Sequence, residues 1–134
     1  MAAIETIEKD NLLARSTELG QQFESRARAW QKKWPLIGEV RGLGGMCATE
    51  LVRRAQTRDL ARPGEPADTE TKQIHRYCYE HGLILITAGT FNNVIRLLVP
   101  LAVTDAQFTE GLAILESALS HVATAARPAA LSHA

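Results

Sequence analysis

Arg96 is the residue of this sequence best suited to bind an anion. It lies in the segment VIRLLV at positions 94–99, in which every other side chain is aliphatic. An isolated charge in apolar surroundings costs several kcal/mol, so an anionic group must meet the guanidinium, and its planar fork suits a carboxylate. The residues alone leave two alternatives open, an internal ion pair with an aspartate or glutamate and a site for a carboxylate ligand.

The other reactive residue types are present without forming a recognisable site. The glycines Gly42, Gly44 and Gly45 lack the spacing of a phosphate-binding loop, and a tight turn between strands accounts for them better. Cys47 and Cys78 lie in apolar contexts without a neighbouring base, which is typical of small core residues.

Histidines and lysines also occur in contexts typical of ordinary positions. The histidines do not have the spacing of a metal site: His75, His81, His121 and His133. The lysines lie in polar helical segments typical of solvated side chains: Lys9, Lys32, Lys33 and Lys72. The sequence therefore predicts neither a metal site nor a lysine in a cofactor pocket.

Composition argues against several classes of partner. Fifteen Lys and Arg balance fifteen Asp and Glu, so no net field attracts a nucleic acid. The apolar runs are far shorter than the ~20 residues that span a bilayer, and the first residues lack the pattern of a secretory signal. The two cysteines do not form a disulfide framework. We therefore expect a cytoplasmic protein with one folded domain and no nucleic-acid or membrane partner.

Residue periodicity predicts a helix followed by a pair of strands in the first half of the chain. One amphipathic helix is expected to end at Trp34-Pro35. Its apolar stripe is Leu12, Leu19, Phe23, Ala27 and Trp30. Two short strands, 37–41 and 46–52, then flank the glycine-rich turn, and a charged surface loop is expected at 53–67.

The second half predicts two helices around two strands. One helix starts at Asp68 and ends near Gly82, a position where a left-handed cap is common. Apart from Arg96, the runs 83–86 and 94–99 are apolar, and they predict strands buried on both faces. The last helix has Thr104 as N-cap and Gln107 as its capping-box partner. Its apolar stripe is Phe108, Leu112, Leu115, Leu119 and Val122.

The order of these elements predicts an α+β fold, in which helices cover a small, mostly antiparallel sheet. We expect this domain to occupy residues 1–124. The remaining residues, 125–134, are small and polar without an apolar stripe, and they predict a frayed tail.

Two long stretches carry a family resemblance. VRGLGGMCATELV at 40–52 and TKQIHRYCYEHGLILITAGTFNNVIRLLVPLAVTDAQFTEGLAIL at 71–115 resemble the end of the class-III, or ω-amino acid, pyridoxal-phosphate-dependent aminotransferases. DNLLARSTELG and TAGTFNNVIRLLVP are most similar to the 4-aminobutyrate branch. The resemblance covers nearly the whole chain, and it implies the C-terminal small domain of a fold-type-I transferase. Thr49, Arg54 and Thr109 depart from the family pattern at positions expected on surfaces.

The resemblance also implies a reaction and a role for Arg96. Enzymes of this branch move the amino group of 4-aminobutyrate to 2-oxoglutarate, giving succinate semialdehyde and glutamate, and the arginine matched by Arg96 binds the α-carboxylate. Other ω-amino acid, ornithine or diamine transaminases are the alternatives within the family. A non-catalytic α+β module that binds a carboxylate is the alternative outside it.

The cofactor implied by the resemblance is pyridoxal 5'-phosphate, bound to a lysine as a Schiff base and met by an aspartate at the pyridine nitrogen. Both residues belong to the large domain of the family, upstream of everything that this chain matches. We therefore expect no catalytic and no cofactor-binding residue here, and an inactive isolated chain. The implied partners are amino acid and 2-oxo acid substrates, the large domain of the same enzyme, and a second copy in a homodimer.

Overall fold

A layer of helices lies on one face of a four-stranded sheet in the computed structural model, which describes residues 2–53 and 64–125. The elements are α1 (Ala2–Lys9), α2 (Leu12–Lys33), β1 (Ile37–Leu43), β2 (Met46–Leu51), α3 (Asp68–Glu80), β3 (Ile86–Ala88), β4 (Val94–Leu98) and α4 (Asp105–Ala125). The sheet has the order β1-β2-β4-β3, and every neighbouring pair is antiparallel. This architecture confirms the predicted α+β class.

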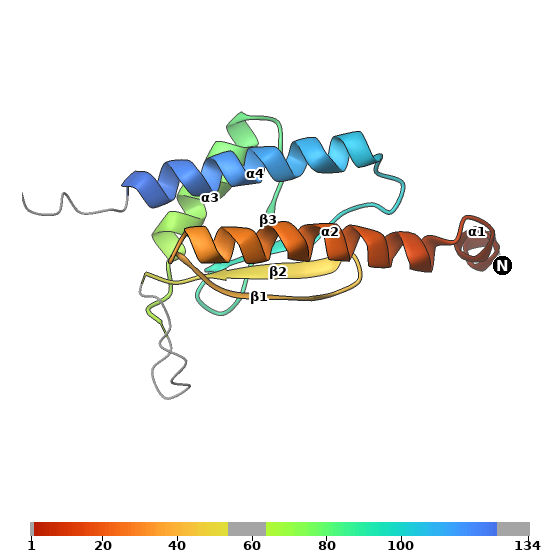
Figure 1. Ribbon diagram of the computed structural model, residues 1–134, viewed down its shortest axis with the longest axis horizontal. Coiled ribbons are helices and arrows are strands. Elements are labelled where there is room, and N and C mark those ends of the chain that lie inside the picture. Colours follow the sequence, from red (N-terminus) through yellow and green to blue (C-terminus); the bar gives the residue numbers. More distant parts are fainter. Residues whose placement is uncertain (1, 54–63, 126–134) are drawn as a thin grey trace, which may run out of the picture.

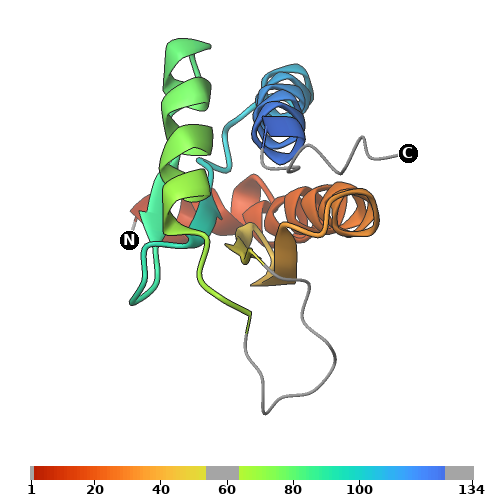
Figure 2. The same ribbon diagram turned by 90° about the vertical axis from the view of Figure 1, so that its left-hand side faces the viewer.

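The three longest helices lie on the same side of the sheet. In Figure 1 they are seen above β1 and β2, and α2 and α4 run in nearly the same direction. The view in Figure 2 looks along α2 and α4 and shows α3 crossing them steeply. Within residues 2–53 and 64–125 no helix is long and apolar enough to cross a membrane.

The first segment forms two helices, whereas its apolar stripe predicts one. Asn11 separates α1 from α2 and has the left-handed angles φ 51° and ψ 42°, which asparagine tolerates better than most residues. None of the residues of α1 is buried, and Ile4 and Ile7 remain 60% and 41% exposed. The predicted stripe of α2 is buried from its second member onward: Leu19, Phe23, Ala27 and Trp30.

The turn between β1 and β2 is the predicted hairpin turn. Gly44 has a φ of 55°, and the N–H of Gly45 donates to Ser16 Oγ of α2 at 2.9 Å. A side chain at Gly20 of α2 would collide with the Gly44 backbone, so the absence of a Cβ permits this close approach. The glycines thus serve packing between helix and hairpin.

Helix α3 ends in a Schellman motif, which explains why the next strand begins later than predicted. Gly82 has a φ of 86°, its N–H donates to the Tyr79 carbonyl at 3.2 Å, and the Leu83 N–H donates to the Cys78 carbonyl at 2.8 Å. Leu83 therefore belongs to the helix cap. The strand starts at Ile86 and not at residue 83.

The last helix confirms its predicted start and its predicted buried side. The Gln107 N–H donates to Thr104 Oγ1 at 3.2 Å, and the Thr104 N–H donates to Gln107 Oε1 at 3.1 Å, which is the reciprocal capping box. All members of the predicted stripe are buried: Phe108, Leu112, Leu115, Leu119 and Val122. The cysteines are buried in the same core, as predicted, with Cys47 4% and Cys78 0% exposed.

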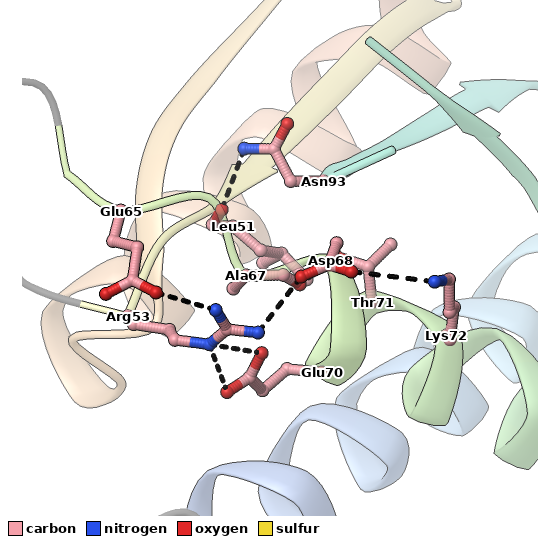
Figure 3. Close-up of polar contacts among 9 residues, drawn as sticks. All are labelled: Leu51, Arg53, Glu65, Ala67, Asp68, Glu70, Thr71, Lys72 and Asn93. Atoms are coloured by element: carbon pink, nitrogen blue, oxygen red, sulfur yellow. Dashed lines mark hydrogen bonds and ion pairs between the residues drawn. The ribbon is translucent and has the colours of Figure 1, made fainter. Parts of the chain in front are cut away.

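Arg53, just after β2, contacts residues just before and at the start of α3. Its N–H donates to the Glu65 carbonyl at 2.8 Å, and its guanidinium lies 2.8 Å from Glu65, 3.0 Å from Asp68 and 3.1 Å from Glu70 (Figure 3). Most of the predicted loop, residues 54–63 with Arg54, lies outside the described residues. The predicted tail also lies outside them, apart from Ala125, which ends α4.

Two burial predictions are wrong. Thr49 was expected on a surface and is only 3% exposed, because it points from β2 toward the helices. The strands β3 and β4 were expected to be buried on both faces, yet Ile86 and Leu98 are 50% and 53% exposed. Their exposure follows from the arrangement of layers, since the described helices cover one face of the sheet only.

Candidate anion-binding site

The face of the sheet that points away from the helices is open. Strand register aligns one row of side chains across it: Arg41, Ala48, Arg96 and Ile86. In the next row Leu43 and Met46 are 81% and 51% exposed. This face therefore combines cations with exposed apolar side chains, a composition that marks an interaction or ligand-binding surface.

Arg96 lies exposed on this face, so the expectation that its charge is buried among aliphatic side chains is wrong. Its neighbours Ile95 and Leu97 point into the core and are 2% and 8% exposed. Successive side chains of a strand point to opposite faces, so the aliphatic neighbours in sequence lie on the other side of the sheet. In this chain the folded state does not require a counter-ion for Arg96.

The alternative of an internal ion pair has no support among residues 2–53 and 64–125. Ten ion pairs connect side chains there, and none of them includes Arg96. A guanidinium without an ion-pair partner can donate its five N–H hydrogens to a carboxylate ligand.

An open hollow of about 400 Å³ lies beside Arg96. Ala48, Ala88 and Gly89 leave room in it because their side chains are small, and Leu43 and Met46 contribute apolar surface. Ligand pockets typically combine apolar lining with a few polar groups that fix orientation. The hollow therefore suits a ligand that joins a carboxylate to an apolar chain.

The second cation of the hollow, Arg41, is already paired. Its Nη1 lies 2.7 Å from Glu39 Oε2 and 3.1 Å from Glu50 Oε2. Sequence reasoning did not identify this cluster. The signal was available in the alternation Glu39-Val40-Arg41, which places the two charged side chains on one face of a strand.

The lysines and cysteines offer no nucleophile in an enclosed pocket. All four lysines are exposed on helices, as predicted; Lys33 Nζ lies 4.5 Å from the centre of the Trp34 ring, and Lys72 pairs with Asp68 at 3.5 Å. Burial raises the pKa of Cys78 to about 11, and burial together with the charge of Glu24 raises the pKa of Cys47. Both thiols are therefore protonated at neutral pH.

Comparison with known proteins identifies the family. The model of the class-III aminotransferases matches residues 1–119. The chain belongs to the class-III aminotransferase family. Such aminotransferases are pyridoxal-phosphate enzymes.

Curated relatives of this aminotransferase chain differ in the amino donor that they are named for. A probable 4-aminobutyrate aminotransferase of Bacillus subtilis is 40% identical over 89% of this chain and 26% of the relative. A 5-aminovalerate aminotransferase of Pseudomonas putida is 40% identical over 92% of this chain and 27% of the relative. The 4-aminobutyrate aminotransferase of Escherichia coli is 38% identical over 86% of this chain and 26% of the relative. The chain thus spans about a quarter of the length of these relatives.

Solved aminotransferases share the fold. An aminotransferase of Bacillus anthracis superposes with a TM-score of 0.74 at 26% identity, over 87% of this chain and 26% of its own. The lysine aminotransferase of Mycobacterium tuberculosis in the internal aldimine form superposes with a TM-score of 0.72 at 25% identity, over 90% of this chain and 24% of its own. These neighbours confirm the predicted fold-type-I relationship.

The residues of this aminotransferase chain do not fit covalent binding of pyridoxal phosphate. A Schiff-base lysine needs a pocket that holds the cofactor and depresses the pKa of the amine. Each of the four lysines is exposed on a helix, away from the open sheet face. No step through the cofactor is therefore assigned to this chain. No cluster of metal-ligating side chains occurs in the part that the structure describes either.

Proposed function

We propose that this chain is the substrate-side small domain of a pyridoxal-phosphate-dependent transaminase that moves the amino group of 4-aminobutyrate to 2-oxoglutarate, giving succinate semialdehyde and glutamate. The names of two relatives at 38–40% identity support this donor. The observation that carries the proposal is the guanidinium of Arg96, which has no ion-pair partner within residues 2–53 and 64–125 and lies beside an open, partly apolar hollow.

In this proposal Arg96 binds the α-carboxylate of glutamate or 2-oxoglutarate with the two-pronged contact that a guanidinium offers. Closure of the rest of the enzyme over the open face removes water from the pair and strengthens it. The large domain supplies the lysine and the cofactor site, and the enzyme acts as a homo-oligomer. This chain contributes substrate orientation and contributes no proton-transferring group.

A second donor has specific support. The 5-aminovalerate aminotransferase of Pseudomonas putida is as similar to this chain as the Bacillus subtilis relative. The two donors differ by one methylene, which a hydrophobic pocket discriminates by roughly 10- to 200-fold at most. Comparing kcat/KM for 4-aminobutyrate, 5-aminovalerate and ornithine in the whole enzyme decides between these donors.

The test of the Arg96 role is the Arg96→Ala variant of the whole enzyme, assayed by single-turnover kinetics of each half-reaction. Loss of a desolvated charge pair typically costs ~2 to 5 kcal/mol, so the 2-oxoglutarate half-reaction should slow by roughly 30-fold to several thousandfold. The 4-aminobutyrate half-reaction should suffer less, because this donor has no α-carboxylate. Arg96→Lys should recover little.

Two results would contradict this role. Equal losses in both half-reactions, together with a large fall in melting temperature, would make Arg96 a structural residue. Tight carboxylate binding by this chain alone, combined with a whole protein that lacks transaminase activity, would favour the non-catalytic binding module.

A further inference from the structure

Glu50 has two cations within reach on the open face of the sheet. In the register of the strands, Ala48 of β2 lies between Arg41 of β1 and Arg96 of β4. Glu50 follows two residues later on the same face of β2, so it is the diagonal neighbour of both arginines. Diagonal Cβ atoms in a sheet are roughly 7–8 Å apart, a span that a glutamate and an arginine bridge easily.

In the structure Glu50 pairs with Arg41, and Arg96 has no ion-pair partner in the part of the chain that the structure describes. Glu50 Oε2 lies 3.1 Å from Arg41 Nη1, which also holds Glu39 at 2.7 Å. Asn93 Nδ2 donates to Glu50 Oε1 at 3.4 Å and to the Leu51 carbonyl at 2.9 Å, so it approaches Glu50 from the end of the row away from Arg96. Arg41 thus binds one oxygen of this carboxylate from β1, on the side of β2 away from Arg96, and Asn93 binds the other oxygen.

Direct binding of a second ligand carboxylate by Arg41 is the competing role. Its Nε and Nη2 have no partner among residues 2–53 and 64–125, so the donors for such a contact exist. However, a carboxylate at Arg41 would meet Glu39 and Glu50, and two negative charges beside one positive charge repel a further anion. The charges of this cluster therefore favour an indirect role.

We propose that Arg41 is a positioning residue for the carboxylate site of Arg96: it holds Glu50 away from Arg96 and so keeps Arg96 free for substrate. This inference rests on the proposed carboxylate binding by Arg96. When Arg41 loses its charge, Glu50 turns to Arg96 and becomes an internal competitor. Each carboxylate ligand must then displace an ion pair that is already formed.

The experiment is an Arg41→Gln variant of the whole enzyme, with KM for 2-oxoglutarate, kcat, and the inhibition constant of glutarate as readouts. An exposed ion pair supports a change of about twofold to fivefold in the KM and in the inhibition constant, with kcat unchanged. The competing pair of Glu50 and Arg96 forms before the rest of the enzyme closes over this face, while salt still screens it, so the change should shrink when about 0.5 M sodium chloride is added.

Two double variants separate the positioning role from a structural or direct one. Arg41→Gln with Glu50→Gln should restore the affinity of the unmodified enzyme, because the competitor is gone. Arg41→Gln with Glu39→Gln is the matched control and should not restore it, because Glu39 lies on β1, two strands away from Arg96. Rescue by both double variants, or by neither, overturns the inference.

The Arg96→Ala variant distinguishes this inference from the function on which it rests. If Arg96→Ala leaves 2-oxoglutarate affinity unchanged, the proposed function itself fails. If Arg96→Ala weakens the affinity but Arg41→Gln leaves it unchanged at low salt, only the positioning role of Arg41 fails.

Discussion

Thr49 and Thr71 are both buried threonines, and they differ in how their hydroxyl groups are satisfied. Thr49 Oγ1 has no hydrogen-bond partner among the described residues, whereas Thr71 Oγ1 donates to the Ala67 carbonyl at 2.7 Å. A buried polar atom without a partner keeps its desolvation cost, while a paired one recovers it. The same substitution should therefore have opposite effects at the two positions.

Thr49→Val should raise the free energy of unfolding by roughly 1 kcal/mol, because it removes an unpaired hydroxyl and keeps the branched shape that suits a strand. Thr71→Val is the matched control and should lower it by about the same amount. Urea unfolding of both variants measures the difference. A loss of stability in Thr49→Val would mean that its hydroxyl has a partner, such as a buried water, that the contacts between residues do not show.

At the scale of elements, the Arg53 cluster joins the end of β2 to the start of α3. Partial desolvation opposes ionisation of Asp68, but the Thr69 N–H and the Arg53 guanidinium outweigh it and lower the pKa of Asp68. Hydrogen bonds to Glu70 and Glu65 raise the pKa of Arg53 above its usual value. Both shifts favour the charged forms, so the cluster stabilises the folded chain as long as its carboxylates are ionised.

Arg53→Gln should lower the melting temperature at pH 7, because three carboxylates then face one another without their shared cation. A carboxyl with a depressed folded pKa contributes stability above its unfolded pKa, near 4, and loses it as pH falls through the folded value. The difference in melting temperature between the variant and the unmodified chain should therefore be fully present at pH 7 and should shrink below about pH 4. Melting curves at pH 7 and pH 3 test this.

Arg76→Gln on α3 is the control, since Arg76 is 81% exposed and its one ion pair among the described residues is with Glu80, four residues away. Such pairs contribute little, so its melting temperature should hardly change. A loss for Arg76→Gln as large as that for Arg53→Gln would contradict a special role for the cluster.

The elements that the sequence predicted well are those with strong local signals. The capping box at Thr104 and the left-handed Gly82 depend on neighbours within one or two turns, so their residue types suffice to predict them. The break at Asn11 was missed because no glycine or proline marks it in the sequence, and an asparagine adopts the left-handed angles there. The burial of Arg96 was predicted wrongly because adjacent aliphatic residues say nothing about which face of the sheet stays uncovered.

The residues of the candidate site also differ in whether the sequence alone predicts them. Arg96 could be singled out from its own segment, but the Arg41–Glu50 pair depends on the pairing of β1 with β2, and the hollow depends on the pairing of all four strands. Strand order and register bring together residues far apart in the chain, and local patterns do not encode them. Sequence reasoning therefore found the ligand-binding candidate and missed the residues that surround it.

At the scale of the whole molecule, recognition and chemistry lie in different parts of the proposed enzyme. The chain spans about a quarter of the length of its curated relatives and carries an open face on which Arg96 has no ion-pair partner among the described residues. That face is also apolar around Arg96, as the exposure of Leu43, Met46 and Leu98 shows. A surface of this kind is typical of one that another part of the same protein covers.

This division predicts that the chain on its own does not form a stable internal aldimine with pyridoxal phosphate. Its four lysines are exposed on helices, and an amine in water, outside a pocket that holds the cofactor, binds an aldehyde only reversibly. After incubation with the cofactor and dialysis, the absorbance of a protein-bound aldimine should be absent, whereas the whole enzyme treated in parallel should retain it. Borohydride reduction followed by peptide mapping identifies any lysine that reacts. Stoichiometric labelling of one lysine that survives dialysis would show that this chain holds a cofactor site of its own, and the proposed separation of recognition from chemistry would then have to be withdrawn.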